Sequence, residues 1–217
     1  MTDTPRGIVV VGAGGFGREV VALVLALRAT GTDHALAGVV DDAPSEDNRA
    51  RLARLGIELL GTVDDLARDC AGIPVAIAIG AADARRSIAN RLAAAGATFP
   101  VLVHPDATVG ADVKLGEGAI ICPGARLSAQ IEVGRHVHID QNVAVGHDVV
   151  IEDFARLNPS SCVSGTVRLE TGVLIGANAT VLQGLAIGAG SLVGAGSVVT
   201  HDVPAGATAY GVPARVH

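Results

Sequence analysis

The sequence predicts two domains, an α/β domain with a Rossmann-like arrangement over residues 1–103 and a parallel β-helix over residues 104–217. Strand and helix patterns alternate around a glycine-rich loop in the first part, whereas the second part repeats one apolar position every six residues. Composition agrees with a narrow core, because 2% of the 217 residues are aromatic and 28 are glycine. We therefore expect a core of aliphatic side chains and many tight turns.

The glycine-rich loop lies between a first strand and a first helix. The predicted order is a strand over Gly7–Val11, the loop Gly12-Ala13-Gly14-Gly15-Phe16-Gly17, a helix over Arg18–Arg28, and a strand over Leu36–Val40 that ends at Asp41. This order, with an acid after the second strand, is typical of dinucleotide-binding folds. Glycines in such loops let backbone N–H groups approach a phosphate at the helix N-terminus.

The rest of the α/β domain is short. We predict strands over Ile57–Leu60, Val75–Ile79 and Thr98–Val103, and a helix over Ala82–Ala95 whose polar side includes Arg85, Arg86 and Arg91. The domain has about half the usual length of a full NAD-binding domain. We therefore favour a nucleotide carried on a sugar as the ligand, with NAD(H) and a purely structural loop as alternatives.

The six-residue repeat runs without interruption from Val109 to Val199, and all sixteen repeat positions are Val, Ile or Leu. The next residue is glycine at seven of them. This period fits neither an amphipathic helix nor an alternating strand. It predicts a coil with three flat sides, in which three hexads form one turn and turns stack at roughly 4.8 Å.

His147 is the candidate catalytic residue. It lies two residues after the repeat position Val145, so we expect it at or near a corner of the coil, with Asp148 beside it. The equivalent position one turn later is Gly165, which leaves space beside the ring. An imidazole beside a carboxylate suits a general base for an amine or hydroxyl nucleophile. From spacing alone, a solvent-facing corner histidine fits equally well.

The stretch from His136 to Phe154 resembles the sialic-acid-type sugar O-acyltransferases and the related nucleotide-aminosugar N-acetyltransferases, both built from hexapeptide repeats. The segments Leu157–Pro159, Gly194–Thr200 and Tyr210–Ala214 match as well, as does the glycine-loop domain, so the resemblance covers nearly the whole chain. It implies a left-handed β-helix, a homotrimer, and acetyl-CoA as co-substrate.

The resemblance also implies roles for individual residues. His147 would be the base and Asp148 would orient it, without an acyl-cysteine intermediate. Acetyl-CoA is expected at Arg156, Gly176, Ala177, Gly194 and Ala195. The sugar substrate and its nucleotide are expected at Gly12, Gly14, Gly15, Phe16, Asp41, Arg85, His138 and Asp140. Some N-acetyltransferase relatives have Asn and His where this chain has Asp140 and Arg156, so we expect these two residues to influence the substrate.

A metal site is not expected. His136, His138 and Asp140 alternate along one strand and could share a face. The sequence lacks, however, the histidine pair five residues apart that the β-helix carbonic anhydrases have. A surface position or a substrate contact is the expectation for His138.

Charge and cysteine content restrict the partners. A net charge of −6 without a basic cluster argues against nucleic acid. Cys70, Cys122 and Cys162 have no metal-binding spacing and suit a reducing cytoplasm. The beginning of the chain does not read as a secretory signal, and no apolar stretch approaches the roughly 18 residues of a membrane span. We therefore expect a cytoplasmic protein without a membrane partner.

Together these patterns predict acetyl-CoA-dependent N-acetylation of a nucleotide-linked amino sugar by direct transfer. The alternatives are O-acetylation of a sugar or sialic acid, and a nucleotide-binding β-helix protein without catalysis.

Overall fold

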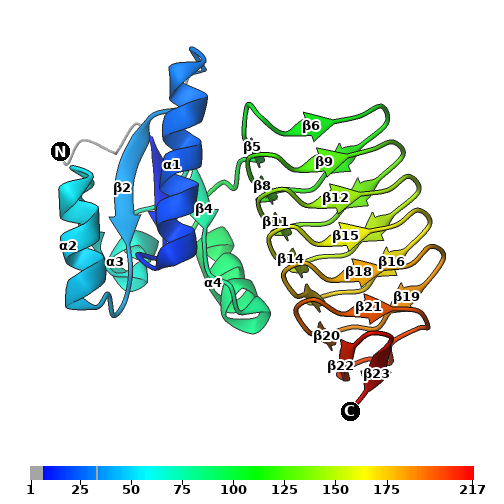
Figure 1. The fold of residues 1–217 in the computed structure, drawn as a ribbon. Coiled ribbons are helices and arrows are strands. Elements are labelled where there is room, and N and C mark those ends of the chain that lie inside the picture. Colours follow the sequence, from blue (N-terminus) through cyan, green and yellow to red (C-terminus); the bar gives the residue numbers. More distant parts are fainter. Residues whose placement is uncertain (1–6, 33) are drawn as a thin grey trace. The chain divides into compact units, whose positions relative to one another are not determined.

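The computed structural model describes residues 7–32 and 34–217, and the chain divides into two compact units, Met1–Leu102 and Val103–His217 (Figure 1). We call them the α/β unit and the β-helix. Among the residues described, no helix is long and apolar enough to cross a membrane.

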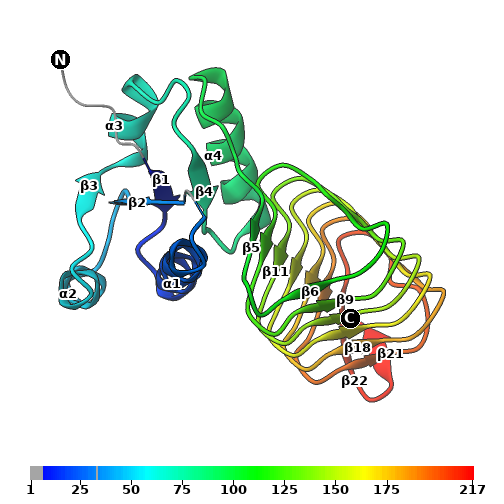
Figure 2. The same ribbon diagram turned by 90° about the horizontal axis from the view of Figure 1, so that it is seen from above.

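The α/β unit is a four-stranded parallel sheet of order β3-β2-β1-β4. Its strands are β1 (Ile8–Val11), β2 (Leu36–Val40), β3 (Leu59–Gly61) and β4 (Val75–Ile77). Helices α1 (Gly15–Ala29) and α2 (Glu46–Arg54) lie on one face of the sheet, and α3 (Val63–Arg68) and α4 (Ala82–Ala94) lie on the other (Figure 2). Strand order reverses between β1 and β4, and the carboxyl ends of strands at such a switch point are where open α/β sheets bind ligands.

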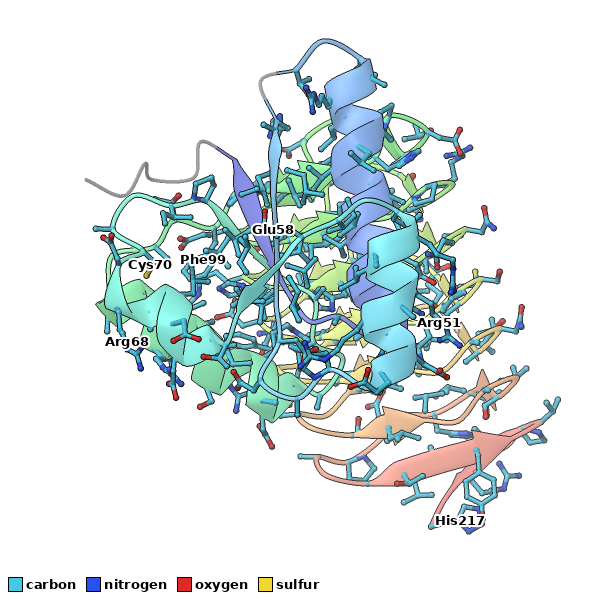
Figure 3. All side chains as sticks on the ribbon, turned by 90° about the vertical axis from the view of Figure 1, so that its left-hand side faces the viewer. Arg51, Glu58, Arg68, Cys70, Phe99 and His217 are labelled. Atoms are coloured by element: carbon cyan, nitrogen blue, oxygen red, sulfur yellow. The ribbon has the colours of Figure 1, made fainter. Side chains whose placement is uncertain are left out.

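The interior of the α/β unit is apolar. All four residues of β1 are buried, as expected for a central parallel strand. Phe99 and Cys70 are also buried (Figure 3). Burial raises the pKa of the Cys70 thiol, which keeps it protonated and unreactive.

Two helices of the α/β unit were not predicted. The sequence of α2 has little apolar character, and its beginning is marked by Ser45, whose side chain accepts a hydrogen bond from the backbone N–H of Asn48. The short helix α3 begins with a capping box between Thr62 and Asp65. The predicted strand Thr98–Val103 is mostly irregular, because only Leu102 and Val103 form a strand.

The β-helix is built from three sheets in which each strand pairs in parallel with the strand one turn away, as in Glu132 with Val150. Sheet I contains β7 (Lys114–Leu115), β10 (Glu132–Val133), β13 (Val150–Ile151), β16 (Arg168–Leu169) and β19 (Ala186–Ile187). Sheet II contains β6 (Thr108–Val109), β9 (Arg126–Leu127), β12 (Ala144–Val145), β15 (Cys162–Val163), β18 (Thr180–Val181) and β21 (Val198–Val199). Sheet III contains β5 (Leu102–Val103), β8 (Ile120–Ile121), β11 (His138–Ile139), β14 (Arg156–Leu157), β17 (Leu174–Ile175), β20 (Leu192–Val193), β22 (Thr208–Gly211) and β23 (Ala214–Val216), the last pair antiparallel.

The repeat positions form the core of the β-helix. From Ile121 to Val199, each of them is at most 4% exposed. Val109 is 37% exposed and Leu115 is half-buried, because the first turn has a neighbour on one side only. The prediction that the repeat aliphatics point inward is therefore confirmed from the second turn onward.

The corners of the coil lie three residues after each repeat position. Residues with positive φ recur there every six residues, and nine of them, including His136, Asp148 and Asn178, are not glycine. The corners form three edges: edge A, with Asp148, joins sheets II and I; edge B, with His136, joins sheets I and III; edge C, with Asn178, joins sheets III and II. The glycines directly after repeat positions instead allow turns to stack closely, since a Cβ on Gly134 would lie 2.6 Å from the backbone nitrogen of Asp153.

Candidate active site

His147 and Asp148 lie on edge A, between β12 and β13. The Nδ1 atom of His147 is 2.6 Å from Oδ2 of Asp148, and the two side chains are 55% and 50% exposed. Asp148 has a φ of 58°, so the corner itself places the carboxylate beside the preceding ring. An Nδ1–H that donates to this carboxylate leaves the Nε2 lone pair free to accept a proton.

The backbone on both sides holds this pair in place. The N–H of Asp148 donates to the carbonyl of Ala129 in the turn before, at 3.2 Å. The carbonyl of His147 accepts from Thr166 in the turn after, at 2.8 Å. The main chain of edge A is therefore fixed at His147, and only the imidazole ring can adjust.

Gly165 lies against the His147 ring. A Cβ at this glycine would lie 2.6 Å from Cε1, 2.7 Å from Nε2 and 3.1 Å from Cδ2 of the ring. This confirms the prediction that Gly165 leaves space beside His147.

His138, Asp140 and Arg156 form a cluster on sheet III. His138 and Asp140 are 0% and 1% exposed, so the surface position expected for His138 is wrong, whereas a contact of these two residues with the substrate stays a prediction. Oδ2 of Asp140 accepts from Nη2 of Arg156 at 2.8 Å and from Nε at 3.2 Å. The two departures from the relatives therefore form one ion pair. Arg156 is 18% exposed, and its expected contact with acetyl-CoA stays a prediction.

Four of the five residues expected at acetyl-CoA, all except Arg156, lie at edge C, where Gly176 and Ala177 follow β17, and Gly194 and Ala195 follow β20. Gly176 is buried, because a Cβ there would lie 2.5 Å from the nitrogen of Ala195. The missing side chain of Gly176 therefore lets the next turn pack closely. Of these four residues, Ala195 is the exposed one. Sheet II separates edge C from edge A, so a single chain does not bring these residues to His147.

The glycine loop leaves open space at the N-terminus of α1. A Cβ on Gly14 or Gly15 would meet nothing within 4 Å, whereas one on Gly17 would meet the carbonyl of Gly12. Phe16 is half-buried beside them. Helix α1 has no side-chain cap and no acid in its first turn. Its dipole therefore favours an anion at this end.

Asp41 orders the loop from the end of β2. Its Oδ2 accepts from the N–H of Ala13 at 2.7 Å, and its Oδ1 accepts from Ala43 at 2.9 Å. Arg18, which was not predicted as a site residue, donates to the Ala13 carbonyl at 2.9 Å and to Asn48 at 2.7 Å. Its place in the first turn of α1, directly after the last glycine, is the signal that could have identified it.

Arg85 is a buried arginine with backbone partners. It is fully buried on α4, and its Nη1 donates to the carbonyls of Ile79 and Gly80 at 2.6 and 2.9 Å. The prediction that it lies on the polar side of the helix is therefore wrong, and its contact with the substrate stays a prediction. It supports the turn that follows β4.

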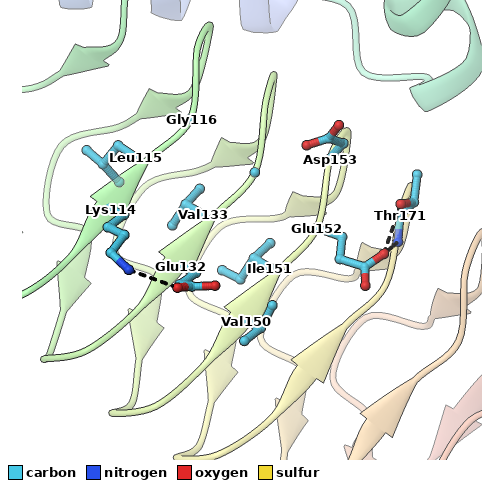
Figure 4. Close-up of a pocket in the computed structure, with 11 residues that line it drawn as sticks. Lys114, Leu115, Gly116, Glu132, Val133, Val150, Ile151, Glu152, Asp153 and Thr171 are labelled. Atoms are coloured by element: carbon cyan, nitrogen blue, oxygen red, sulfur yellow. Dashed lines mark hydrogen bonds and ion pairs between the residues drawn. The ribbon is translucent and has the colours of Figure 1, made fainter.

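A groove of about 570 Å³ lies on sheet I (Figure 4). Its charged groups are paired: Lys114 binds Glu132 at 3.0 Å, and Glu152 accepts two hydrogen bonds from Thr171 at 3.0 Å. None of the predicted site residues lines it. Among the residues that the structure describes, no group of three or more His, Cys, Asp or Glu could hold a metal ion.

Two family models match the chain. Residues 7–92 match the PglD N-terminal domain, and residues 166–201 match the hexapeptide repeat of succinyl-transferase. These segments lie in the α/β unit and in the later turns of the β-helix.

Proteins similar over the whole chain are sugar N-acetyltransferases. The GDP-perosamine N-acetyltransferase of Escherichia coli O157:H7 is 32% identical over 213 residues, 95% of this chain and 94% of that protein. A crystal structure of a histidine-to-asparagine mutant of perosamine N-acetyltransferase from Caulobacter crescentus, in complex with CoA and GDP-perosamine, is 30% identical with a TM-score of 0.85, over 97% of this chain and 96% of that one. The acetyltransferase domain of PglB from Neisseria gonorrhoeae FA1090, in complex with acetyl coenzyme A, is 28% identical with a TM-score of 0.82, over 99% of this chain and 100% of that one.

These similarities confirm the predicted fold, an α/β N-terminal domain followed by a left-handed parallel β-helix of hexapeptide repeats. They also confirm the predicted enzyme class, a CoA-dependent acyltransferase that acts on sugars. The chain belongs to the bacterial hexapeptide-repeat sugar acetyltransferases, the family of the GDP-perosamine N-acetyltransferases.

Proposed function

We propose that this protein transfers the acetyl group of acetyl-CoA to the amino group of a nucleotide-linked amino sugar, with His147 as the general base. The observation that carries the assignment of the base is the exposed His147 ring, held by Asp148 at 2.6 Å on a fixed corner of the coil. The relatives support the substrate class, because structures of the Caulobacter crescentus enzyme contain CoA and GDP-perosamine. Two of these structures are of mutants in which one histidine is replaced, by asparagine or by alanine.

The chemistry is a direct transfer. The sugar amine attacks the thioester carbonyl carbon of acetyl-CoA, so a C–N bond forms, and Nε2 of His147 takes a proton from the amine. Asp148 stabilises the imidazolium through Nδ1–H. The tetrahedral intermediate then expels the CoA sulfur as the C–S bond breaks, and the thiolate takes up a proton. The products are an N-acetyl sugar and free CoA thiol.

The α/β domain, residues 1–103, would hold the nucleotide. Gly14, Gly15 and Phe16 line the open space at the start of α1, where a diphosphate would meet backbone N–H groups and the helix dipole. Asp41 would contribute to nucleotide binding indirectly, because its carboxylate holds the glycine loop at Ala13. GDP is the first nucleotide to test, because the relatives named above include two GDP-perosamine enzymes.

The protein would act as a homotrimer in the cytoplasm. His147 is on edge A, and the accessible residues expected at acetyl-CoA, Ala177 and Ala195, are on edge C. A site shared between chains would place edge A of one copy against edge C of the next. This arrangement assigns acyl transfer to residues 104–217 and explains why His147 is half exposed in a single chain.

The test is thiol release from acetyl-CoA with UDP-, dTDP- and GDP-linked amino sugars and with free sialic acid. We expect release with an amino sugar nucleotide, and a loss of at least about a hundredfold in turnover for His147→Ala. His201→Ala, at another exposed histidine of the coil, is the matched control and should leave turnover unchanged. Light scattering on the same sample should give the mass of three chains.

Other outcomes separate the alternatives. Release only with a sugar that lacks an amine would make the protein an O-acetyltransferase. Absence of release together with undetectable acetyl-CoA binding in calorimetry would favour the non-catalytic alternative. Near-normal turnover of His147→Ala would remove His147 as the base, and full activity in a monomer would rule out the shared site.

A further inference from the structure

The glycine at position 165 is not required by the backbone. The corresponding positions in the other turns, spaced by 18 residues, hold Ala111, Ala129, His147, Gln183 and His201. The corner therefore accommodates side chains of different sizes at this point. Gly165 is also absent from the residues with positive φ, the conformation that favours glycine.

A side chain at position 165 would meet the face of the His147 ring. The added Cβ would lie closest to Cε1 and Nε2, at 2.6 and 2.7 Å, and at 3.1 Å from Cδ2. Three ring atoms at such similar distances place this carbon above the ring plane rather than at its edge. The separation is about 1 Å shorter than the 3.5–4.0 Å optimum for carbon contacts.

The main chain cannot open to relieve this contact at low cost. Thr166 donates to the carbonyl of His147 at 2.8 Å, and Gly184 donates to the carbonyl of Gly165 at 3.1 Å. Gly146 is stacked equally closely, since a Cβ there would lie 2.6 Å from the nitrogen of Gly165. The movable part is the His147 ring, which is 55% exposed.

We propose that Gly165 is a positioning residue for catalysis, whose missing side chain lets the His147 ring lie flat against the next turn with Nδ1 at Asp148. The proposal rests on the proposed function, because it takes His147 as the base. With a methyl group at position 165, the ring turns outward, its 2.6 Å contact with Asp148 breaks, and Nε2 leaves the position from which it deprotonates the acceptor amine.

The test is Gly165→Ala, assayed by thiol release and by thermal unfolding. We expect kcat to fall about a hundredfold, the effect of misplacing a reactive group by about 1 Å. The KM for acetyl-CoA should stay unchanged, which a general loss of structure would not give. Gln183→Ala, at the same corner position one turn later, is the control and should keep full kcat.

The same substitution in a His147→Ala background separates positioning from folding. Without the ring there is no clash, so Gly165→Ala should cause no further loss of kcat and no fall in Tm. An equal fall in Tm in both backgrounds would show a structural role and overturn the proposal.

If the single variant fails to fold, normal folding of the double variant still identifies the ring as the clashing group, and failure of both overturns the proposal. Full kcat in Gly165→Ala, with His147→Ala inactive, would reject this inference and leave the proposed function standing, whereas an active His147→Ala would reject the proposed function.

Discussion

A Cβ on Gly116, Gly134 or Gly176 in the β-helix would meet backbone atoms of the next turn at 2.5–2.6 Å, whereas one on Gly14 or Gly15 in the α/β unit would meet nothing within 4 Å. The first three glycines serve packing, since neighbouring turns share the space that a side chain would fill. The other two leave space that the protein itself does not fill. Gly184 and Gly196 are equally open, but their positive φ explains them as turn residues. Gly14 and Gly15 have no positive φ and lie at the start of a helix, so their open space is the kind that indicates a ligand site.

Gly165 is a packing glycine that also serves the site. A side chain there would meet the His147 ring, which has a proposed chemical role, rather than backbone atoms. In a solenoid, each position is set by the turns before and after it. A functional residue in the β-helix therefore needs a compensating residue one turn away. The α/β unit has no such repeat, and its site depends on a single loop held by Asp41 and Arg18.

The largest effect should come from adding a methyl group at a packing glycine. Gly134→Ala would place a carbon 2.6 Å from the nitrogen of Asp153 and 2.8 Å from the carbonyl carbon of Glu152. We expect a loss of about 1–3 kcal/mol in the free energy of unfolding, the usual cost of overpacking, measured by urea denaturation. Unchanged stability would mean that the turns separate at low cost, and the contrast with the α/β glycines would then disappear.

The β-helix could be predicted because its period depends on side chains that are visible in the sequence. Burial of the repeat aliphatics followed directly, whereas the positive φ three residues later did not. A positive φ is usually predicted from a glycine, and corner residues such as Phe154 and Thr166 adopt it without being glycine. In the α/β unit, the helices α2 and α3 were missed because their starts are marked by caps rather than by apolar periodicity.

The candidate site divides in the same way. The relation of His147 to Asp148 and Gly165 follows from adjacency and from the 18-residue turn. The Asp140–Arg156 ion pair spans two strands of sheet III and was interpreted as two separate departures. Arg85 shows the limit of helix patterns, since a fully buried arginine with carbonyl partners has the same sequence signature as an exposed one.

The open glycines should respond in the opposite direction to Gly134. Gly15 is the first residue of α1, so Gly15→Ala should raise the free energy of unfolding by about 0.4–1 kcal/mol by restricting the unfolded chain. The methyl group would occupy the space proposed for the nucleotide, and we expect the KM for the sugar nucleotide to rise about tenfold, equivalent to about 1.4 kcal/mol. The KM for acetyl-CoA is the internal control. An unchanged KM for both substrates would argue that this space is not where the nucleotide binds.

The smallest expected effect concerns the side-chain caps of the α/β unit, at the starts of α2 and α3. The question is whether such a cap makes this unit sensitive to acid. Hydrogen bonds from the Thr62 hydroxyl and N–H hold the pKa of Asp65 below its ordinary 3.8. A carboxyl whose pKa is lower in the folded state stabilises the fold above its unfolded-state pKa and loses that contribution as pH falls through the folded-state value. Asp65→Asn should therefore be less stable than the natural chain at pH 7, and the difference should shrink as pH falls below about 3.8 and vanish below the lower folded-state pKa. Asp47→Asn on α2, where the carboxylate is 85% exposed and 3.8 Å from Arg51, is the control and should show a smaller difference in urea midpoint. A difference for Asp65→Asn that stays constant from neutral pH into acid would mean that the cap acts through its shape and not through its charge.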